Sequence, residues 1–249
     1  YYDYPDKVYE WHNGYLEEKA VSEQVTYLTY LWYLELINFY LKTHPIADLA
    51  GLEMGFRLVL PEEVDVRKPD LGVVLKNNPV PLLPHDSSYH GIFDLCIEAL
   101  SESNADMLKR DTITKKAEYA FAGVKEYTIL DGNKRYSEFY RLNPNGVYVP
   151  IKPVKGGIIK SKVLPGFQFR IDDLYQKPSP DEMVDDPVYQ GFVLPGYSEE
   201  KRARKEAEQR ALKAERNAAK AKNEAQKERQ RAEQLADKLR ALGIDPNKL

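Results

Sequence analysis

The sequence is poor in several residue types that would mark particular classes of protein. Cys96 is the only cysteine among 249 residues, which excludes an internal disulfide and a zinc site built on several cysteines. We expect it to pack in the core rather than act as a nucleophile, in a reducing compartment such as the cytoplasm. No apolar run reaches the roughly 18 residues that a membrane-spanning helix needs. The four histidines show no ligand spacing, so any metal would need oxygen ligands.

Charge is distributed unevenly along the chain. The net charge is −3, yet residues 201–242 carry 14 Lys or Arg against 7 Asp or Glu, which leaves −10 for residues 1–200. Hydrophobic residues make up 43% of the sequence and aromatic residues 11%, enough for a packed core. We therefore expect a globular domain over residues 1–190, a hinge at residues 191–200 and a different kind of segment after it.

That segment is expected to be a long helix. Residues 201–242 consist almost wholly of Ala, Lys, Arg, Glu and Gln, without Gly or Pro. From Ala207 to Leu242, apolar residues recur at alternating steps of 4 and 3, with Glu228 in one such place. This heptad spacing leaves two alternatives, a single solvated helix or a homodimeric coiled coil. Residues 243–249 begin with a glycine that should end the helix, and they form a short tail.

Local patterns in the first 190 residues predict a mixture of strands and helices. Asn13-Gly14 lies between two alternating runs and predicts a β-hairpin. Residues 22–44 predict an aromatic-rich helix with Ser22 as its N-cap. The remaining expected elements are a helix that ends at Gly123, strands within residues 52–60, 70–75, 93–100 and 124–131, and a hairpin of residues 136–142 and 146–150. This order predicts an α/β or α+β fold.

Two carboxylates occupy positions where buried strands are expected. Alternation in FDLCIEALS places Glu98 on the same strand face as Cys96, and Asp70 opens the apolar run LGVVL. A buried carboxylate is costly unless it is paired, hydrogen-bonded or bound to a cation. The two residues therefore predict a cation between them.

The cation could be a side chain or a metal ion. Asp111, Lys115 and Tyr119 recur at intervals of four, so they share one face of the expected helix, and Lys115 could reach the carboxylates. Mg²⁺ is the other candidate, because it takes oxygen ligands and keeps several waters.

Each of these residues also has a purely structural interpretation. Asp70 could simply end a turn after Pro69. Glu98 could pair with a structural arginine such as Arg57 or Arg67. Lys115 could be solvated, as most lysines on helices are.

Taken in order, these motifs resemble the Uma-two family, a cyanobacteria-rich group of the PD-(D/E)XK restriction-endonuclease-like superfamily. The resemblance spans residues 8–174 and includes YEWHNGYLEEK, GFRLVL, the Pro69-Asp70 pair, CIEALS, AGVKEYTILD and VLPGFQFRIDDL. It implies a mixed central sheet flanked by helices. It also implies an endonuclease that uses Mg²⁺ or Mn²⁺ to hydrolyse phosphodiester bonds of nucleic acid, with DNA preferred to RNA as the expected partner.

The resemblance assigns roles to the residues already singled out. Asp70, Glu98 and the carbonyl of Ala99 would bind the metal, and Lys115 would be the motif lysine. Lys116 is the adjacent alternative and points about 100° away on a helix.

Three further positions relate to the family pattern. Leu100 stands where the superfamily motif has a lysine, which is why the lysine is sought on the following helix. Tyr119 matches a tyrosine that follows the lysine by one helical turn. The additional acid that the family carries on its first helix would be Glu23, with Glu18 as the second choice.

A metal-dependent endonuclease is therefore the expected function. The alternative is a catalytically inactive nuclease-like module that assembles through its C-terminal coiled coil. A sugar hydrolase with two catalytic carboxylates is a third hypothesis, which leaves the lysine-bearing helix unexplained. The charge of −10 on the first 200 residues disfavours simple binding to duplex DNA, whereas the basic helix could compensate.

Overall fold

A computed structural model describes residues 8–12, 15–19, 23–52, 54–61, 63–100 and 108–241. The chain divides into two compact units, Tyr1–Pro195 and Gly196–Leu249.

The first unit is built on a six-stranded sheet with the order β10-β9-β8-β7-β6-β3. Its strands are β3 (Ala47–Ala50), β6 (Leu71–Leu75), β7 (Leu95–Ala99), β8 (Glu126–Leu130), β9 (Glu138–Leu142) and β10 (Tyr148–Pro150). β7 and β8 run parallel, and the other neighbouring pairs are antiparallel. A parallel pair needs a crossover connection, and the helical segment between β7 and β8 lies in that connection. The mixed central sheet expected from the sequence is confirmed.

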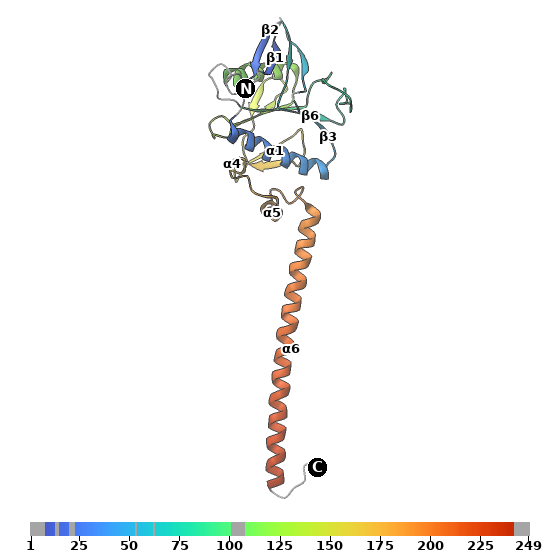
Figure 1. Ribbon diagram of the computed structural model, residues 1–249, viewed down its shortest axis with the longest axis vertical. Coiled ribbons are helices and arrows are strands. Elements are labelled where there is room, and N and C mark those ends of the chain that lie inside the picture. The colour runs from blue at the N-terminus through green and yellow to red at the C-terminus, as the bar shows by residue number, and fades with distance from the viewer. Residues whose placement is uncertain are drawn as a thin grey trace, which may run out of the picture. The chain divides into compact units, whose positions relative to one another are not determined.

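One face of this sheet is covered by α1 (Gln24–Thr43) (Figure 1). Its buried hydrophobic residues follow helical spacing and belong to one core with the sheet residues Val73 and Ile97; they are Trp32, Tyr33, Leu36, Ile37 and Tyr40. The same core includes residues from the small sheet of β11 (Ile158–Lys160) and β12 (Gln168–Arg170) and from the short helices α4 (Asp173–Gln176) and α5 (Pro180–Met183). α1 contacts α4 directly.

The other face carries a second core around Phe56, Cys96, Tyr119 and Tyr127. A π-helical turn, η1 (Arg110–Thr114), continues into α3 (Lys115–Ala122), which ends at Gly123 in the left-handed conformation, as expected. A four-stranded sheet of order β2-β1-β5-β4 completes the unit. Its strands are β1 (Val8–His12), β2 (Tyr15–Lys19), β4 (Phe56–Val59) and β5 (Val64–Arg67).

Several element ends differ from the expectations. The first hairpin is confirmed by the pairing of His12 with Tyr15, and its two turn residues lie outside the described residues. α1 has Glu23 as its N-cap, and Ser22, the residue expected there, also lies outside the described residues. Leu52 was expected in a strand but has a positive φ of 53° in the turn between β3 and β4.

The described part of the second unit belongs to one helix, α6 (Pro195–Ala241), of 47 residues, whose first residue is the last of the first unit (Figure 1). At 1.5 Å per residue it spans about 70 Å. It begins inside the range 191–200 that we expected as a hinge, because proline fits the first position of a helix. Residues 242–249, which include the expected cap and tail, lie outside the described residues. Among the residues that the structure describes, no helix is both long and apolar enough to cross a membrane.

Candidate active site

Glu98 is a buried carboxylate on β7, with an exposed fraction of 2%. β7 lies between β6 and β8 in the central sheet, so its side chains face the interior on both sides. Both carboxylate oxygens have partners from α3. The Nζ atom of Lys115 lies 3.1 Å from Oε2, and the hydroxyl of Tyr119 donates to Oε1 at 2.8 Å. Lys115, one of the two cations that the sequence suggested for the space between Asp70 and Glu98, thus contacts Glu98.

Asp111 is the second carboxylate at this lysine. Its Oδ1 atom lies 3.2 Å from Nζ of Lys115, whose exposed fraction is 1%. The ammonium group is therefore held between two acids, one of which, Asp111, shares the helix face of Lys115 as the four-residue spacing predicted. The backbone N–H of Lys115 donates to the carbonyl of Arg110, five residues earlier, so Lys115 directly follows a π-helical turn. Such turns often occur at functional sites.

Asp70 lies just before β6, at the end of the ladder that β6 forms with β7. The register pairs Leu71 with Ile97, so Asp70 falls opposite Glu98. Its Oδ2 atom accepts a hydrogen bond of 2.6 Å from the backbone N–H of Ala99. The Tyr30 hydroxyl donates to the Asp70 carbonyl at 3.1 Å, which ties this corner to α1. The structure thus brings Asp70, Glu98, Ala99 and Lys115 into one region.

The residues of this region differ in burial. Asp70 and Ala99 are half-buried, whereas Glu98, Asp111 and Lys115 are buried. Asp70 and Ala99 are therefore the more exposed residues of the group.

Burial and the negative charge of Glu98 raise the pKa values of two neighbouring side chains, Cys96 and Tyr127. Burial raises the pKa of the Cys96 thiol well above its ordinary value, and the charge of Glu98 raises it further. The same two causes, in the same order, raise the pKa of Tyr127, whose hydroxyl donates to the Asp111 carbonyl at 2.9 Å. Cys96 therefore stays a thiol in the core, as expected.

Other residues suggested by the sequence lie elsewhere. Lys116 points to Tyr140, with Nζ 4.6 Å from the ring centroid, so it does not join Lys115. Glu23 is exposed and accepts a hydrogen bond of 3.0 Å from Asn133. Glu18 was the second choice for an acid on the first helix, but it belongs to strand β2.

Arg67, which the structural interpretation suggested as a partner of Glu98, pairs with Glu118. Its Nε and Nη2 atoms donate to the two carboxylate oxygens of Glu118 at 2.7 and 2.8 Å. Nη2 also lies 3.6 Å from Asp65. Sequence reasoning missed this buried cluster, because Arg67 and Glu118 are 51 residues apart and no local pattern links them.

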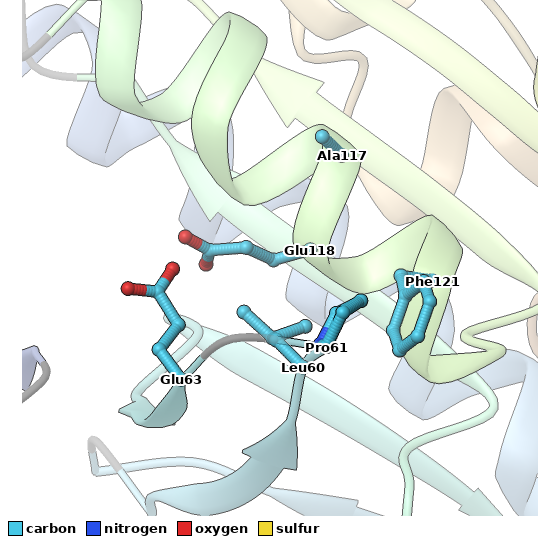
Figure 2. A pocket seen from close by; sticks show the side chains of 6 residues that line it. All are labelled: Leu60, Pro61, Glu63, Ala117, Glu118 and Phe121. Carbon is cyan, nitrogen blue, oxygen red and sulfur yellow. The ribbon is translucent and has the colours of Figure 1, made fainter.

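The same acids form a carboxylate group that could accept a cation. Ligand oxygens of Glu63, Asp65 and Glu118 lie within 4.8 Å of one another. Figure 2 shows the side chains of Glu63 and Glu118 at a pocket of about 450 Å³, which Phe121 also lines. Since the Arg67 guanidinium already pairs with Glu118 and lies close to Asp65, we interpret this cluster as structural.

Comparisons with known proteins agree with this architecture. A family model described as "Uma2: Putative restriction endonuclease" matches residues 1–172. A solved structure, a "putative nuclease belonging to DUF820 from Anabaena variabilis ATCC 29413", has a TM-score of 0.55 and is 15% identical. The match covers 71% of this chain and 95% of that one, and it shows likeness of fold. No curated protein matches the chain. Because the family model covers more than half of its residues, the chain belongs to the Uma2 family, the group that its motifs resemble.

Proposed function

We propose that the protein is a divalent-metal-dependent endonuclease that hydrolyses phosphodiester bonds in nucleic acid, with DNA as its substrate. Family membership over residues 1–172 supports a nuclease. The observation that carries the finer proposal is the meeting of Glu98 and Lys115 at 3.1 Å, next to the hydrogen bond between Asp70 and Ala99. The nuclease domain would comprise residues 1–190, and residues 201–242 would form a separate helical segment.

The donor set fits Mg²⁺ or Mn²⁺. The carboxylates of Asp70 and Glu98 and the carbonyl of Ala99 are oxygen donors, the kind that these ions prefer. Asp70, the residue before β6, falls opposite Glu98 of β7 when the ladder register is extended by one residue. When bound, the ion would lower the pKa of a water and neutralise charge on the scissile phosphate.

The side chains around Glu98 have complementary roles in this proposal. Lys115 would orient the attacking water and hold an oxygen of the five-coordinate phosphorus through its ammonium group. Tyr119 fixes one oxygen of Glu98, which leaves the carboxylate a single orientation. Asp111 holds the lysine from its other side. A substrate would approach along the half-buried side formed by Asp70 and Ala99.

A cleavage assay tests the proposal. Plasmid DNA and single-stranded DNA are incubated with the protein in Mg²⁺ or Mn²⁺, beside the variant Asp70→Asn. We expect the wild type to cut at least one substrate and the variant to lose about 100-fold or more in rate. RNA is assayed in parallel, since cleavage of RNA alone would overturn the choice of DNA.

Asp48→Asn is the matched control. Asp48 lies on β3, the strand paired with β6, and its exposed side chain forms an ion pair with Lys76. Its replacement should leave the cleavage rate unchanged. Cleavage that survives Asp70→Asn at the wild-type rate would rule out the proposed metal site.

A second candidate is an inactive nuclease-like module that assembles as a homodimer through α6. The burial of Glu98 and Lys115 as a mutually neutralising pair favours it, because such a pair can be purely structural. It predicts no cleavage of any nucleic acid together with retained self-association. A cytoplasmic location fits both candidates, since the single cysteine is buried and reduced.

A further inference from the structure

α6 carries a seam with a coiled-coil period, and the seam residues from Ala207 to Leu235 are exposed. We define the seam as the positions a and d of its heptads: Ala207, Ala211, Ala214, Ala218, Ala221, Ala225, Glu228, Ala232, Leu235 and Leu239. Leu235 has an exposed fraction of 64%, so its side chain is available for contact with a second helix. Alanine buries little area, so the leucine end would supply most of the apolar contact.

The charges beside the seam match a parallel, in-register pair of helices. In that arrangement each g residue faces the e residue five positions later on the second copy. Arg210 then faces Glu215, and Glu224 faces Arg229, both with opposite charges. Between Ala203 and Lys238, no such pair has like charges. Electrostatic complementarity of this kind selects orientation and register.

An antiparallel pair fits less well. The central antiparallel register would pair Ala207 with Ala232 across the seam, and it would set g residues against g residues and e residues against e residues. Its e pairs have opposite charges, but Arg210 would lie opposite Arg231, a repulsive pair that symmetry repeats and that the parallel register lacks. It would also separate the leucine ends, whereas the parallel arrangement packs Leu235 against Leu235.

Glu228 lowers the affinity of the parallel dimer. It occupies a d position, so the two copies bring two carboxylates together in the seam. Each Glu228 also lies next to Arg229, an e residue, of the other copy, and the two can form an ion pair. A polar residue in the seam lowers affinity and favours one register.

We propose that α6 binds a second copy of this chain as a parallel, in-register, two-stranded coiled coil, with its affinity concentrated around Leu235. The inference deepens the homodimer named with the proposed function. A parallel coil tethers two copies of the first unit at the same end, because both helices begin at Pro195.

Disulfide trapping in the full chain tests the orientation. Leu235→Cys should form a covalent dimer on mild oxidation, since d residues of parallel helices face each other. Glu233→Cys is the control: it lies at position b on the outer face and should stay uncrosslinked. Cys96 is buried and should not compete. Equal crosslinking of both variants, or none of Leu235→Cys, would overturn the proposal.

Two further measurements make the test complete. In the first, the variants Ala207→Cys and Ala232→Cys are mixed and oxidised, and the linked peptides are identified by mass spectrometry. A disulfide between the two sites would show antiparallel pairing and overturn the proposal. Sedimentation equilibrium of Glu228→Leu should give a dimer dissociation constant lower than wild type by about 10-fold or more. An unchanged or higher constant would contradict the in-register seam. These readouts do not depend on nucleic-acid cleavage, so the dimer and the nuclease can fail separately.

Discussion

The ammonium group of Lys115 lies 3.1 Å from Glu98 and 3.2 Å from Asp111, although the first acid is on β7 and the second on the turn before α3. All three side chains are buried. Two carboxylates thus share one lysine next to the ladder of β6 and β7, at whose end Asp70 lies. The same contacts therefore contribute to the stability of the fold and to the proposed chemistry.

Lys115→Met should destabilise the protein strongly. The change leaves Glu98 buried without its ammonium partner, which costs about 3–5 kcal/mol in the free energy of unfolding. Urea denaturation measures the loss. Lys116→Met is the matched control, because Lys116 contacts Tyr140 at a partly buried position, and we expect a loss below about 1 kcal/mol there.

The double variant Lys115→Met with Glu98→Gln distinguishes the contribution of the ion pair to the free energy of unfolding from the contribution of side-chain packing. A neutral glutamine no longer needs the ammonium, so part of the stability should return. The two single losses and the double loss form a thermodynamic cycle with an expected coupling above about 1 kcal/mol. Strictly additive losses would contradict a direct interaction between the two residues.

Tyr119→Phe should weaken cleavage as well as stability. The variant removes the hydroxyl that donates to Glu98, a hydrogen bond to a charged group worth about 1.5–3 kcal/mol. Tyr148→Phe removes another phenolic donor, whose acceptor is the carbonyl of Val124 away from the site. We expect the first variant to lower the affinity for Mn²⁺ and the second to leave it unchanged, as titration calorimetry would measure. Equal affinities would show that Tyr119 does not position a ligand.

Gly72→Ala should destabilise the central sheet. A Cβ atom on Gly72 would lie 2.5 Å from the ring of Phe93, which also packs against Phe56 and Tyr89. Overpacking of this kind costs about 1–3 kcal/mol. Gly51→Ala is the control, since nothing lies within 4 Å of its added Cβ atom. Thermal unfolding of the two variants measures the difference, and equal midpoints would contradict the tight contact at Gly72.

Asp186→Asn should reduce stability at neutral pH and have less effect in acid. Hydrogen bonds from Arg170 at 2.6 and 2.8 Å lower the pKa of Asp186, partly opposed by burial. A lowered carboxyl pKa contributes stability above about pH 4 that is lost as the pH falls through the folded value. We expect a loss of about 1–2 kcal/mol at pH 7 that shrinks below pH 4, by urea denaturation at several pH values. A loss independent of pH would contradict this ion pair.

The sequence predicted the parts of the site that depend on local patterns. Glu98 stood out because a carboxylate interrupts an apolar strand, and Lys115 because it shares a helix face with Asp111 and Tyr119. Both predictions follow from the periods of strands and helices. Their roles in metal binding and catalysis remain proposals.

The features that the sequence did not predict depend on long-range contacts or weak local signals. The ion pair of Arg67 with Glu118 joins β5 to α3 across 51 residues. Strand β3, with the sequence ADLA, has little β propensity of its own and forms because it pairs with β6. Residues 151–194 contain only short elements, which no periodicity marks. By contrast, α6 followed directly from composition.

Anomalous diffraction from a crystal of the full chain soaked in Mn²⁺ tests the central claim most directly. The account predicts one manganese peak between the carboxylates of Asp70 and Glu98, with the carbonyl of Ala99 as a further ligand. A peak among Glu63, Asp65 and Glu118 instead, or none at a concentration that supports cleavage, would contradict it.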